Sequence, residues 1–545
     1  NWRIATDTNM TNIINSGFGY TNESKDWTFK VDATNLQPGD YYYYDFKAQG
    51  RYSIRGRTKT APLGDVDSLR FGIASCSNWE HGYFSPYRHL LERNDIDYIL
   101  HLGDYIYEYE VGGYSSNISG RENIPAHEVI TLEDYRLRYS HYKLDDDLRK
   151  LHQQYPFINI WDDHESANDS YRFGADNHTP GTEGTWADRK NNSGKAYHEW
   201  LPIRSPQPGT HRIYRTFEFG DLINLPMLDT RIEARDLQGG SSETNDPLRT
   251  LLGPTQFNWL KNNLNTSTKR WNIIGQQVML SPMEFLGNPL NYDQWDGYNY
   301  ERQQLLNFVV DSAINNFVVL TGDIHTSWVH DIPLSNYDGA NCIGSAGVEF
   351  VCTSVTSTSF INFNISQFIL NSTNPHLQYS NTSKRGYGVL DVNKNRTQFD
   401  FYYMDDIEDP QSNQYYGDGY YVNNNEKCAN QASAPSSRVG PLQYYAPEFP
   451  IDYVANIHQE EMVLFGIYPN PTVDKITLQV YLHNNERLTL KVYDMRGRVI
   501  MNKETTTLQK GANYMNLDLQ GLPKGTYNIS LESKNKAITK TIVKL

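Results

Sequence analysis

Three short apolar runs in this chain each end in acidic and histidine residues. They read ILHLGDYIY over 99–107, FINIWDDHE over 157–165 and FVVLTGDIH over 317–325. A short apolar run that ends at a tight turn is typical of a buried strand, and its polar end lies at the carboxyl edge of a sheet, where α/β folds gather ligands. Asp, His and Tyr side chains without Lys suit metal ions better than an anion alone. The pattern therefore predicts a metal-dependent enzyme.

The hydrophobic pattern between residues 66 and 455 alternates between strand and helix periods. A capping box of Thr131 and Asp134 starts a long predicted helix. Helices are expected at 86–93, 131–152, 254–264 and 298–313, and strands at 69–74, 223–228 and 271–276, besides the three runs above. Alternation over this length predicts an α/β domain.

Residues 1–65 have the short alternating pattern of β-strands. Alternation is clear at 27–32 and again at 41–46, after the turn Gln-Pro-Gly-Asp at 37–40. The arrangement Leu-x-Pro-x-x-x-Tyr at 36–42 is similar to the tyrosine corner of fibronectin-like sandwiches. We therefore expect a fibronectin-like β-domain, shorter than the roughly 100 residues of a full sandwich.

The last part of the chain differs from the rest in pattern and in charge. Residues 410–460 are rich in Asn, Gln, Tyr and Pro and predict a loop-rich linker, whereas short strands between turns at 463–545 indicate a small β-sandwich. The segment 463–545 has twelve Lys/Arg and six Asp/Glu, a net charge of +6, which leaves −21 for the rest. Such a sign change marks a domain boundary. We expect domains at 1–65, 66–455 and 463–545.

The charge and composition of the whole chain argue against two classes of function. A net charge of −15 in 545 residues disfavours a nucleic-acid-binding surface and an anionic-membrane surface. No stretch approaches the roughly 18 apolar residues of a membrane helix, so no membrane span is expected. The chain begins at Asn1 rather than Met, which predicts a processed or trimmed N-terminus. A negative protein can still bind phosphate where metal ions dominate the local field.

The four cysteines allow two interpretations. Cys76, Cys342, Cys352 and Cys428 are widely spaced, without a CxxC pair or zinc-finger spacing. In a secreted protein they could form two disulfides. If Cys76 instead ligates a metal, an odd number of cysteines is left.

Each motif after a strand has a chemical interpretation and a plainer alternative. Asp104 can bridge two metals and Tyr107 can give a phenolate to a ferric ion; the alternative is a turn Asp with a core Tyr. In Asp-Asp-His-Glu at 162–165, an Asp can ligate a metal while the His transfers protons; the alternative is a solvated helix N-terminus. Asp323 and His325, two apart in an extended segment, point the same way. The prediction rests on all three motifs following strands in one domain.

Together these motifs resemble the metallophosphoesterases, and in particular the PhoD-type alkaline phosphatases. The order is Gly-Asp-x-x-Tyr at 103–107, Asp-His-Glu at 163–165 in place of Asn-His-Glu, and Gly-Asp-x-His at 322–325, with Ser-Cys-Ser at 75–77 in place of Asp-x-His. Other stretches that agree are TKTAP at 58–62, LDTR at 228–231, GVEFV at 347–351, TSVTS at 353–357, NPH at 374–376 and RGY at 385–387. The resemblance covers residues 1–455 and implies a metallophosphoesterase-type αββα sandwich.

The resemblance also implies a metal centre of ferric iron (Fe3+) with calcium (Ca2+) beside it. The implied iron ligands are Cys76, Asp104, Tyr107 and His325. The candidate calcium ligands are Asp104, Asp163, Asn168 and Asp323. Thiolate, phenolate and imidazole suit iron, whereas carboxylate and amide oxygens suit calcium.

The implied activity is hydrolysis of phosphate monoesters and diesters, small or polymeric, by a secreted enzyme. A hydroxide shared by the metals would attack phosphorus in line, and His164 would protonate the leaving alkoxide. Arg231 is a candidate for a phosphate contact, with a structural salt bridge as the alternative. Two other functions stay open. They are a phospholipase D-like or teichoic-acid phosphodiesterase on the same fold, and a non-catalytic surface binding protein that calcium stabilises.

A second, independent resemblance covers about eighty residues at the end of the chain. YPNP at 468–471, VYDMRG at 492–497, LPKGTY at 522–527 and the closing KTIVKL look like the type A sorting domain of the type IX secretion system. This implies recognition by the secretion machinery, export across an outer membrane, and release or attachment at the cell surface. A generic β-sandwich for carbohydrate binding or adhesion is the alternative.

Overall fold

The chain forms two compact units, Asn1–Ala446 and Pro447–Leu545, in a computed structural model. The structure describes residues 1–204, 211–285, 287–359, 367–438, 444–447, 462–482, 484–533 and 537–545. No helix among the described residues is both long and apolar enough to cross a membrane.

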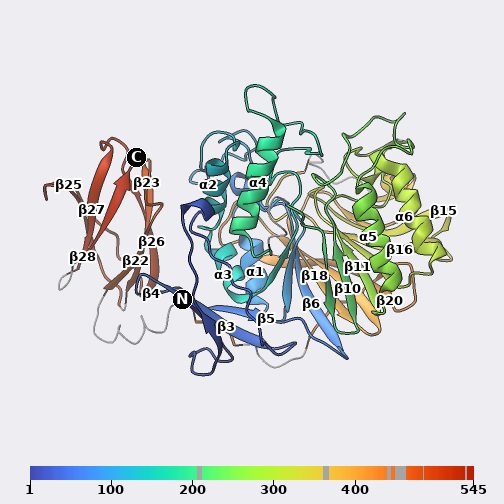
Figure 1. Ribbon diagram of the computed structural model, residues 1–545, viewed down its shortest axis with the longest axis horizontal. Coiled ribbons are helices and arrows are strands. Elements are labelled where there is room, and N and C mark those ends of the chain that lie inside the picture. The colour runs from blue at the N-terminus through green and yellow to red at the C-terminus, as the bar shows by residue number, and fades with distance from the viewer. Residues whose placement is uncertain are drawn as a thin grey trace. The chain divides into compact units, whose positions relative to one another are not determined.

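The larger unit is built on two seven-stranded sheets (Figure 1). The first has the order β21-β20-β19-β18-β6-β7-β8 and pairs β6, β7 and β8 in parallel. Its strands are β6 (Ser68–Ala74), β7 (Tyr98–His101), β8 (Phe157–Asn159), β18 (Gly386–Asn393), β19 (Arg396–Met404), β20 (Gln414–Asn423) and β21 (Asn430–Gln431).

The second sheet has the order β17-β15-β16-β14-β11-β10-β9, and its centre is also parallel. Its strands are β9 (Arg215–Phe219), β10 (Ile223–Met227), β11 (Trp271–Gly275), β14 (Phe317–Thr321), β15 (Ser327–Asp338), β16 (Ile343–Val351) and β17 (Leu377–Asn381). The predicted strands at 69–74, 223–228 and 271–276, and the three runs that end in polar residues, are confirmed within a few residues.

Alternation along β14 shows how the layers pack. Val318 and Leu320 join the apolar core that contains Phe71 of β6, so this face of the second sheet meets the first sheet. Phe317 and Val319 point to the opposite face and join a second core with residues of helices α5 (Gly253–Thr266) and α6 (Asn299–Asp311). Successive side chains of a strand point to opposite faces, so each sheet buries one face against the other and one against helices. The αββα arrangement is confirmed.

The helices that cover the sheets agree with most of the predicted ones. They are α1 (Ser85–Glu92), α2 (Leu132–Tyr142), α3 (Asp146–Gln154), α4 (Trp186–Trp200), α5 (Gly253–Thr266), α6 (Asn299–Asp311) and α7 (Gln367–Asn371), with 3₁₀ turns at Glu23–Lys25, Trp79–His81 and Trp295–Tyr298. The capping box of Thr131 and Asp134 is present at the start of α2. A single helix over 131–152 is wrong, because the Asp145 side chain accepts from two backbone N–H groups and starts a new helix.

The N-terminal segment is one sheet rather than two. The strands β1 (Trp2–Ala5), β2 (Ile13–Gly17), β3 (Tyr41–Ala48), β4 (Arg51–Tyr52) and β5 (Gly56–Lys59) form it. The tyrosine corner is present, since the Tyr42 hydroxyl accepts from the N–H of Gln37 at 2.7 Å. The strand predicted at 27–32 is wrong: the stretch has no ladder partner, and Trp27 is exposed.

The structure also tests the linker predicted at 410–460 and the two interpretations of the four cysteines. Residues 410–438 are not a plain linker, because β20 and β21 extend the first sheet there; residues 439–443 and 448–461 lie outside the described part. Cys342 and Cys428 form a disulfide that ties the start of β16 to the segment after β20. Cys76 and Cys352 are both buried and unbonded to sulfur.

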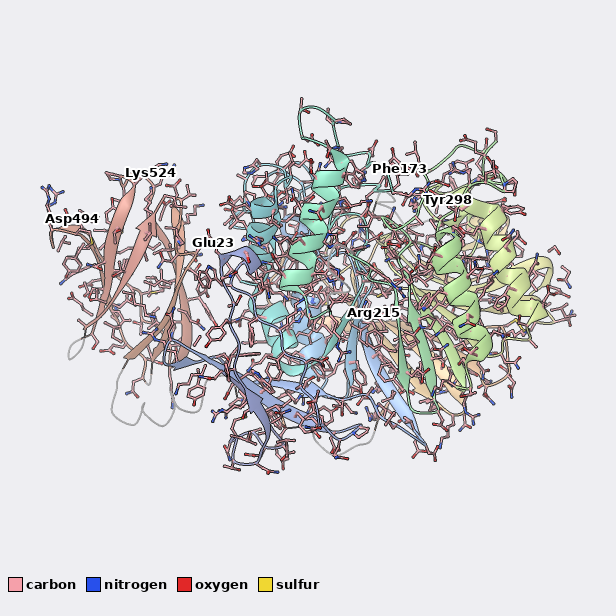
Figure 2. The ribbon with its side chains drawn as sticks, in the orientation of Figure 1. Glu23, Phe173, Arg215, Tyr298, Asp494 and Lys524 are labelled. Carbon is pink, nitrogen blue, oxygen red and sulfur yellow. A yellow bond between two sulfur atoms is a disulfide. The ribbon has the colours of Figure 1, made fainter. Side chains whose placement is uncertain are left out.

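The smaller unit has two antiparallel sheets, β22-β23-β26 and β25-β24-β27-β28. Its strands are β22 (Met462–Tyr468), β23 (Lys475–Leu482), β24 (Thr489–Asp494), β25 (Val499–Glu504), β26 (Gly511–Asp518), β27 (Gly525–Glu532) and β28 (Ala537–Lys544). Alternate residues of both sheets share one apolar core, as in a β-sandwich. Asp494 and Lys524 lie at the same end of these strands (Figure 2), because Asp494 pairs with Tyr527. The predicted β-sandwich is confirmed.

Candidate metal centre

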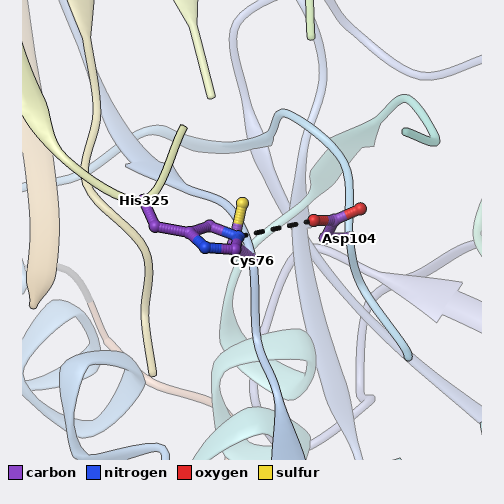
Figure 3. Close-up of side chains that lie close together, drawn as sticks. All are labelled: Cys76, Asp104 and His325. Atoms are coloured by element: carbon purple, nitrogen blue, oxygen red, sulfur yellow. Dashed lines mark ion pairs between the residues drawn. The ribbon is translucent and has the colours of Figure 1, made fainter. Parts of the chain in front are cut away.

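The carboxyl ends of four parallel strands bring the predicted ligands together. Cys76 follows β6, Asp104 follows β7, Asp163 follows β8, and Asp323 and His325 follow β14. The predicted ligands and their neighbours form three groups, and within each group the possible ligand atoms all lie within 4.8 Å of one another. These groups are Cys76, Asp104 and His325; Asp104, Asp163 and His164; and Asp162, Asp163 and Asp323. Figure 3 shows the first group, in which side chains from three separate loops converge.

Sharp backbone turns aim these side chains at one another. Four of these residues have backbone φ angles in the left-handed region, which residues other than glycine rarely adopt. The angles are 59° at Cys76, 55° at Asp104, 63° at Asp323 and 58° at His325. Strain of this kind persists at functional sites where the surroundings enforce it. At Gly103 an added Cβ would lie 2.4 Å from the Cβ of Asp162, so only glycine lets the loops after β7 and β8 approach.

Hydrogen bonds fix the first group in a ligand-ready form. The Nδ1 atom of His325 lies 2.8 Å from the carbonyl of Thr358. A carbonyl can only accept, so Nδ1 carries the ring proton and Nε2 presents a lone pair. That Nε2 lies 3.1 Å from the Tyr107 hydroxyl and 3.9 Å from Asp104 Oδ2. The Tyr107 hydroxyl donates to Asp104 at 2.9 Å. The phenol, the carboxylate and the imidazole therefore converge on one position.

The electrostatics of this group fit a cation. Burial, and then the charge of Asp104, raise the pKa of the Cys76 thiol and of the Tyr107 phenol well above their ordinary values. Burial and the charge of Arg385 lower the pKa of His325 to about 3, which leaves its imidazole neutral. A buried thiol and phenol give up their protons only when a positive charge compensates them. Thiol, phenol, neutral imidazole and carboxylate together are the donor set of a transition-metal ion.

The second part of the site consists of carboxylates around Arg231. The Arg231 side chain is fully buried, and its Nε donates to Asp162. Its Nη1 donates to Asp293 and its Nη2 to Asp323, each at 2.6 Å. Burial and then neighbouring acids, opposed by Arg231, raise the pKa of Asp323 to about 7. Four largely buried acids, Asp162, Asp163, Asp293 and Asp323, share the two guanidinium charges of Arg231 and Arg235, which fits a further cation bound by oxygen ligands.

His164 is oriented by a carboxylate outside the predicted set. Its Nδ1 lies 2.8 Å from Oε2 of Glu108, a fully buried residue. Its Nε2 has no hydrogen-bond partner among the described residues and is the nitrogen that a ligand can reach. Burial alone would lower the pKa of His164, but Asp163, Glu108 and Asp104 raise it well above its ordinary value.

Glu108 also holds the loop that carries Asn168. Its Oε1 accepts from the backbone N–H of Asn168 at 2.7 Å and from the side chain of Asn177 at 3.0 Å. The next residue, Asp169, donates its N–H to Asp163 Oδ2 at 2.6 Å. The loop therefore runs beside the carboxylates, while the role of the Asn168 amide as a calcium ligand stays a prediction.

Glu165 joins the loops after β7 and β8. Its carboxylate accepts from the backbone N–H groups of Asp104 at 3.1 Å, Tyr105 at 2.7 Å and Asp162 at 2.8 Å. Sequence reasoning did not assign roles to Glu108, Asp162, Glu165 or Asp293. The first three adjoin predicted ligands in the chain, but their partners lie about 60 residues away, so spacing alone could not assign them.

Comparison with known proteins agrees with this geometry. Residues 71–401 match the family model of the PhoD-like phosphatases, residues 1–62 match the model of the N-terminal domain of PhoD-like phosphatases, and residues 466–545 match a secretion system C-terminal sorting domain.

Two relatives cover most of the larger unit. Alkaline phosphatase D of Bacillus subtilis (strain 168) is 35% identical in an alignment of 427 residues that covers 75% of this chain and 72% of the relative. A solved structure of PhoD is similar with a TM-score of 0.74 and 32% identity, over 81% of this chain and 86% of that chain.

Proposed function

Since the chain belongs to the PhoD-like phosphatase family, we propose that the side chains gathered at the carboxyl edge bind the metal ions with which it hydrolyses phosphate esters. The chain is a phosphoric ester hydrolase, and its sorting domain indicates secretion through the type IX system. The observation that carries the proposal is the convergence of Cys76, Asp104 and His325 from three loops, with Asp163 and Asp323 beside them.

The donor types divide the site between two kinds of ion. Cys76, Tyr107 and His325 offer sulfur, phenolic oxygen and nitrogen, which suit ferric iron. Asp163, Asp323 and the Asn168 amide offer oxygen only, which suits calcium. Asp104 belongs to two of the three groups, which supports a role in which it would serve both ions.

The chain supplies proton transfer and positioning. Bound metal ions would supply an activated water molecule and neutralise charge that develops on the phosphate oxygens. His164 would give the proton on Nε2 to the leaving oxygen, while Glu108 holds Nδ1 and stabilises the imidazolium. Arg231 would hold Asp162 and Asp323 in place; its nitrogens all donate to carboxylates, which favours the structural salt bridge. A direct phosphate contact by Arg231 stays a prediction.

A metal analysis combined with two substrates tests this function. The purified protein should contain iron and calcium and should hydrolyse a nitrophenyl monoester and a bis-nitrophenyl diester. Asp104→Asn should remove metal and activity together. Asp311→Asn, at an exposed position that ends α6, is the matched control and should change neither. Full activity after calcium-selective chelation, with calcium absent by elemental analysis, would count against the calcium assignment.

The alternative functions predict other results. A phospholipase D-like or teichoic-acid phosphodiesterase on the same fold would prefer the diester or a polymer to the monoester. A surface binding protein that calcium only stabilises would hydrolyse neither ester, although removal of calcium would still lower its unfolding temperature. Family membership favours the hydrolase.

A further inference from the structure

Arg385 is a buried arginine whose charge has no carboxylate partner. The residue is 8% exposed, and its Nε atom is buried without a hydrogen-bond partner. The one side-chain hydrogen bond of Arg385 among the described residues runs from Nη1 to the carbonyl of Lys384, at 3.2 Å. By contrast, Arg231 and Arg235 each donate to Asp293. A buried guanidinium without a counter-charge is costly, so its site is built to receive an anion.

The backbone holds Arg385 against the metal-binding loops. The Thr353 hydroxyl lies 2.7 Å from the carbonyl of Lys384 and 3.3 Å from that of His325. The residue after Arg385, Gly386, starts β18 and donates its N–H to Ser354 at 2.9 Å. These contacts fix the segment beside the turn that carries His325.

The guanidinium charge of Arg385 acts on the first ligand group. It interacts electrostatically with Tyr114, Cys76 and Tyr107, and it also acts on His325. Apart from Asp104, the carboxylates of the three ligand groups lie around Arg231, which donates to Asp162 and Asp323. The site therefore has an acidic side around Arg231 and a cationic side at Arg385.

Two more polar groups line the cationic side. The Tyr114 hydroxyl donates to the carbonyl of Thr358 at 2.6 Å, and that carbonyl also lies 2.8 Å from Nδ1 of His325. The ring of His81 meets that of Tyr114 edge to face at 4.2 Å, and its Nδ1 is buried without a partner. A second unsatisfied nitrogen beside Arg385 adds to the evidence that this space receives a polar ligand.

We propose that Arg385 binds a non-bridging phosphate oxygen of the substrate on the Cys76–His325 side and thereby favours monoesters over diesters. The inference rests on the proposed function. A monoester carries close to two negative charges above pH 7 and a diester carries one, so a guanidinium at a non-ester oxygen stabilises the monoester more. The planar fork of arginine matches two phosphate oxygens, whereas lysine offers a point charge.

The test compares Arg385→Met and Arg385→Lys with Arg204→Met, a control at an exposed arginine that pairs with Asp32. In Arg385→Met, the inhibition constant of inorganic phosphate should rise about ten- to a hundredfold, as expected for loss of a charge-assisted hydrogen bond. The kcat/KM for the monoester should fall by a similar factor and that for the diester by less. Arg385→Lys should lie between the wild type and Arg385→Met, and iron content should stay at one level in all four proteins.

Two results would overturn the phosphate-binding role of Arg385. If Arg385 only offsets the charge of the Cys76 thiolate, Arg385→Met would lose iron or shift its absorption, and both esters would slow alike; that outcome overturns the proposal. An unchanged inhibition constant for phosphate overturns it as well. If Arg385→Met does not fold, the ratio of monoester to diester kcat/KM in Arg385→Lys decides. If the metal-loaded wild type hydrolyses neither ester, the proposed function fails, and calorimetric titration with phosphate still tests Arg385.

Discussion

His164 has one ring nitrogen committed and one available, and this division determines what the residue can do. The Glu108 carboxylate accepts a hydrogen bond from Nδ1 of His164, with 2.8 Å between Oε2 and Nδ1. Asp163 and Asp104 add negative charge near the imidazole ring. An imidazole held in this way can carry a proton on Nε2 toward a leaving group. The bland alternative is that His164 only braces a metal-binding loop.

We expect His164→Ala to slow an alkyl phosphate by about 10² to 10⁴ and an aryl phosphate much less. The alkoxide must be protonated as it leaves, whereas an acidic phenol leaves unaided. Rates on both substrates, with metal content measured on the same samples, check this. Equal losses on the two substrates, together with missing metal, would end the general-acid assignment and leave the hydrolase itself intact.

Cys76 gives a spectroscopic prediction. A thiolate and a phenolate on ferric iron absorb visible light by charge transfer, so the purified protein should be coloured. Cys76→Ala should lose most of the colour and some or all of the iron. Cys352→Ala is the matched control, because this cysteine is equally buried and lies outside the three ligand groups. Full iron content and unchanged colour in Cys76→Ala would refute the assignment.

At the residue scale, the sequence predicted side-chain types better than their roles. It placed Cys76, Asp104 and His325 after strands, and the structure brings them together. It left open whether Arg231 meets phosphate or carboxylates, because the carboxylates Asp162 and Asp293 that surround it come from distant loops. Ion pairs between segments some sixty residues apart leave no local pattern.

At the scale of elements, one carboxylate links two active-site loops. Glu165 accepts from three backbone N–H groups that belong to the loops after β7 and β8. The loop after β7 is strained at Asp104, so its shape depends on such contacts. The loops therefore behave as one unit, fixed before any ion binds.

We expect Glu165→Gln to lower the free energy of unfolding by about 2 to 4 kcal/mol, since one amide oxygen cannot serve three buried donors. Metal content should fall as well, because Asp104 and Asp162 lose their shared anchor. Urea unfolding with elemental analysis measures both. Glu199→Gln, in which the replaced carboxylate pairs with Arg136 near the surface, is the control and should cost about 1 kcal/mol or less. Equal effects of the two substitutions would contradict the anchoring role.

The start of α3 offers a pH-dependent test away from the metal centre. Burial, and then Asp145, raise the pKa of Asp147 to about 7, although Arg88 opposes the shift. The folded chain therefore keeps a proton that the unfolded chain releases between about pH 4 and pH 7, so this residue costs stability as pH rises through that window. The neighbouring Asp146 has a lowered pKa, because Lys150 and Arg149 outweigh burial, and its contribution has the opposite sign.

Asp147→Asn should therefore stabilise the protein at pH 8 by an amount on the order of 1 kcal/mol and have less effect at pH 5. Asp146→Asn, the matched control, should destabilise it slightly at pH 8. Urea unfolding at the two pH values measures both differences. If Asp147→Asn destabilises the protein at pH 8, the favourable interaction of ionised Asp147 with Arg88 and the helix N-terminus outweighs the cost of its burial.

The elements that the sequence predicted well are those with strong local signals. β14 and α5 appear within two residues of their predicted bounds, because four apolar residues in a row and a Pro near the helix start are unambiguous. The break at Asp145 was missed since helical periodicity continues across it. β20 was missed because its Tyr, Gly and Asn residues carry little alternation, and its place is set by pairing with β19.

At the scale of the whole molecule, the division of charge matches the division of structure. The segment 463–545 has a net charge of +6 and the rest −21, and the chain separates into compact units at Ala446 and Pro447. The smaller unit has its own apolar core, which includes Leu478, Val492 and Ile529. All groups proposed to act in catalysis lie in the larger unit. Sorting and chemistry are therefore separable functions of one chain.

We expect a chain truncated after residue 452 to keep most of its kcat, because it retains every proposed ligand, His164 and Arg385. Its unfolding temperature and metal content should match those of the larger unit in the full chain. The same truncation should abolish export in a cell with a type IX system, because it removes the sorting domain. The purified truncated enzyme should remain active. The isolated segment 463–545 should fold by itself, as its separate core requires. A loss of kcat beyond about tenfold, roughly 1.4 kcal/mol of transition-state stabilisation, would mean that the sorting domain contributes to the site.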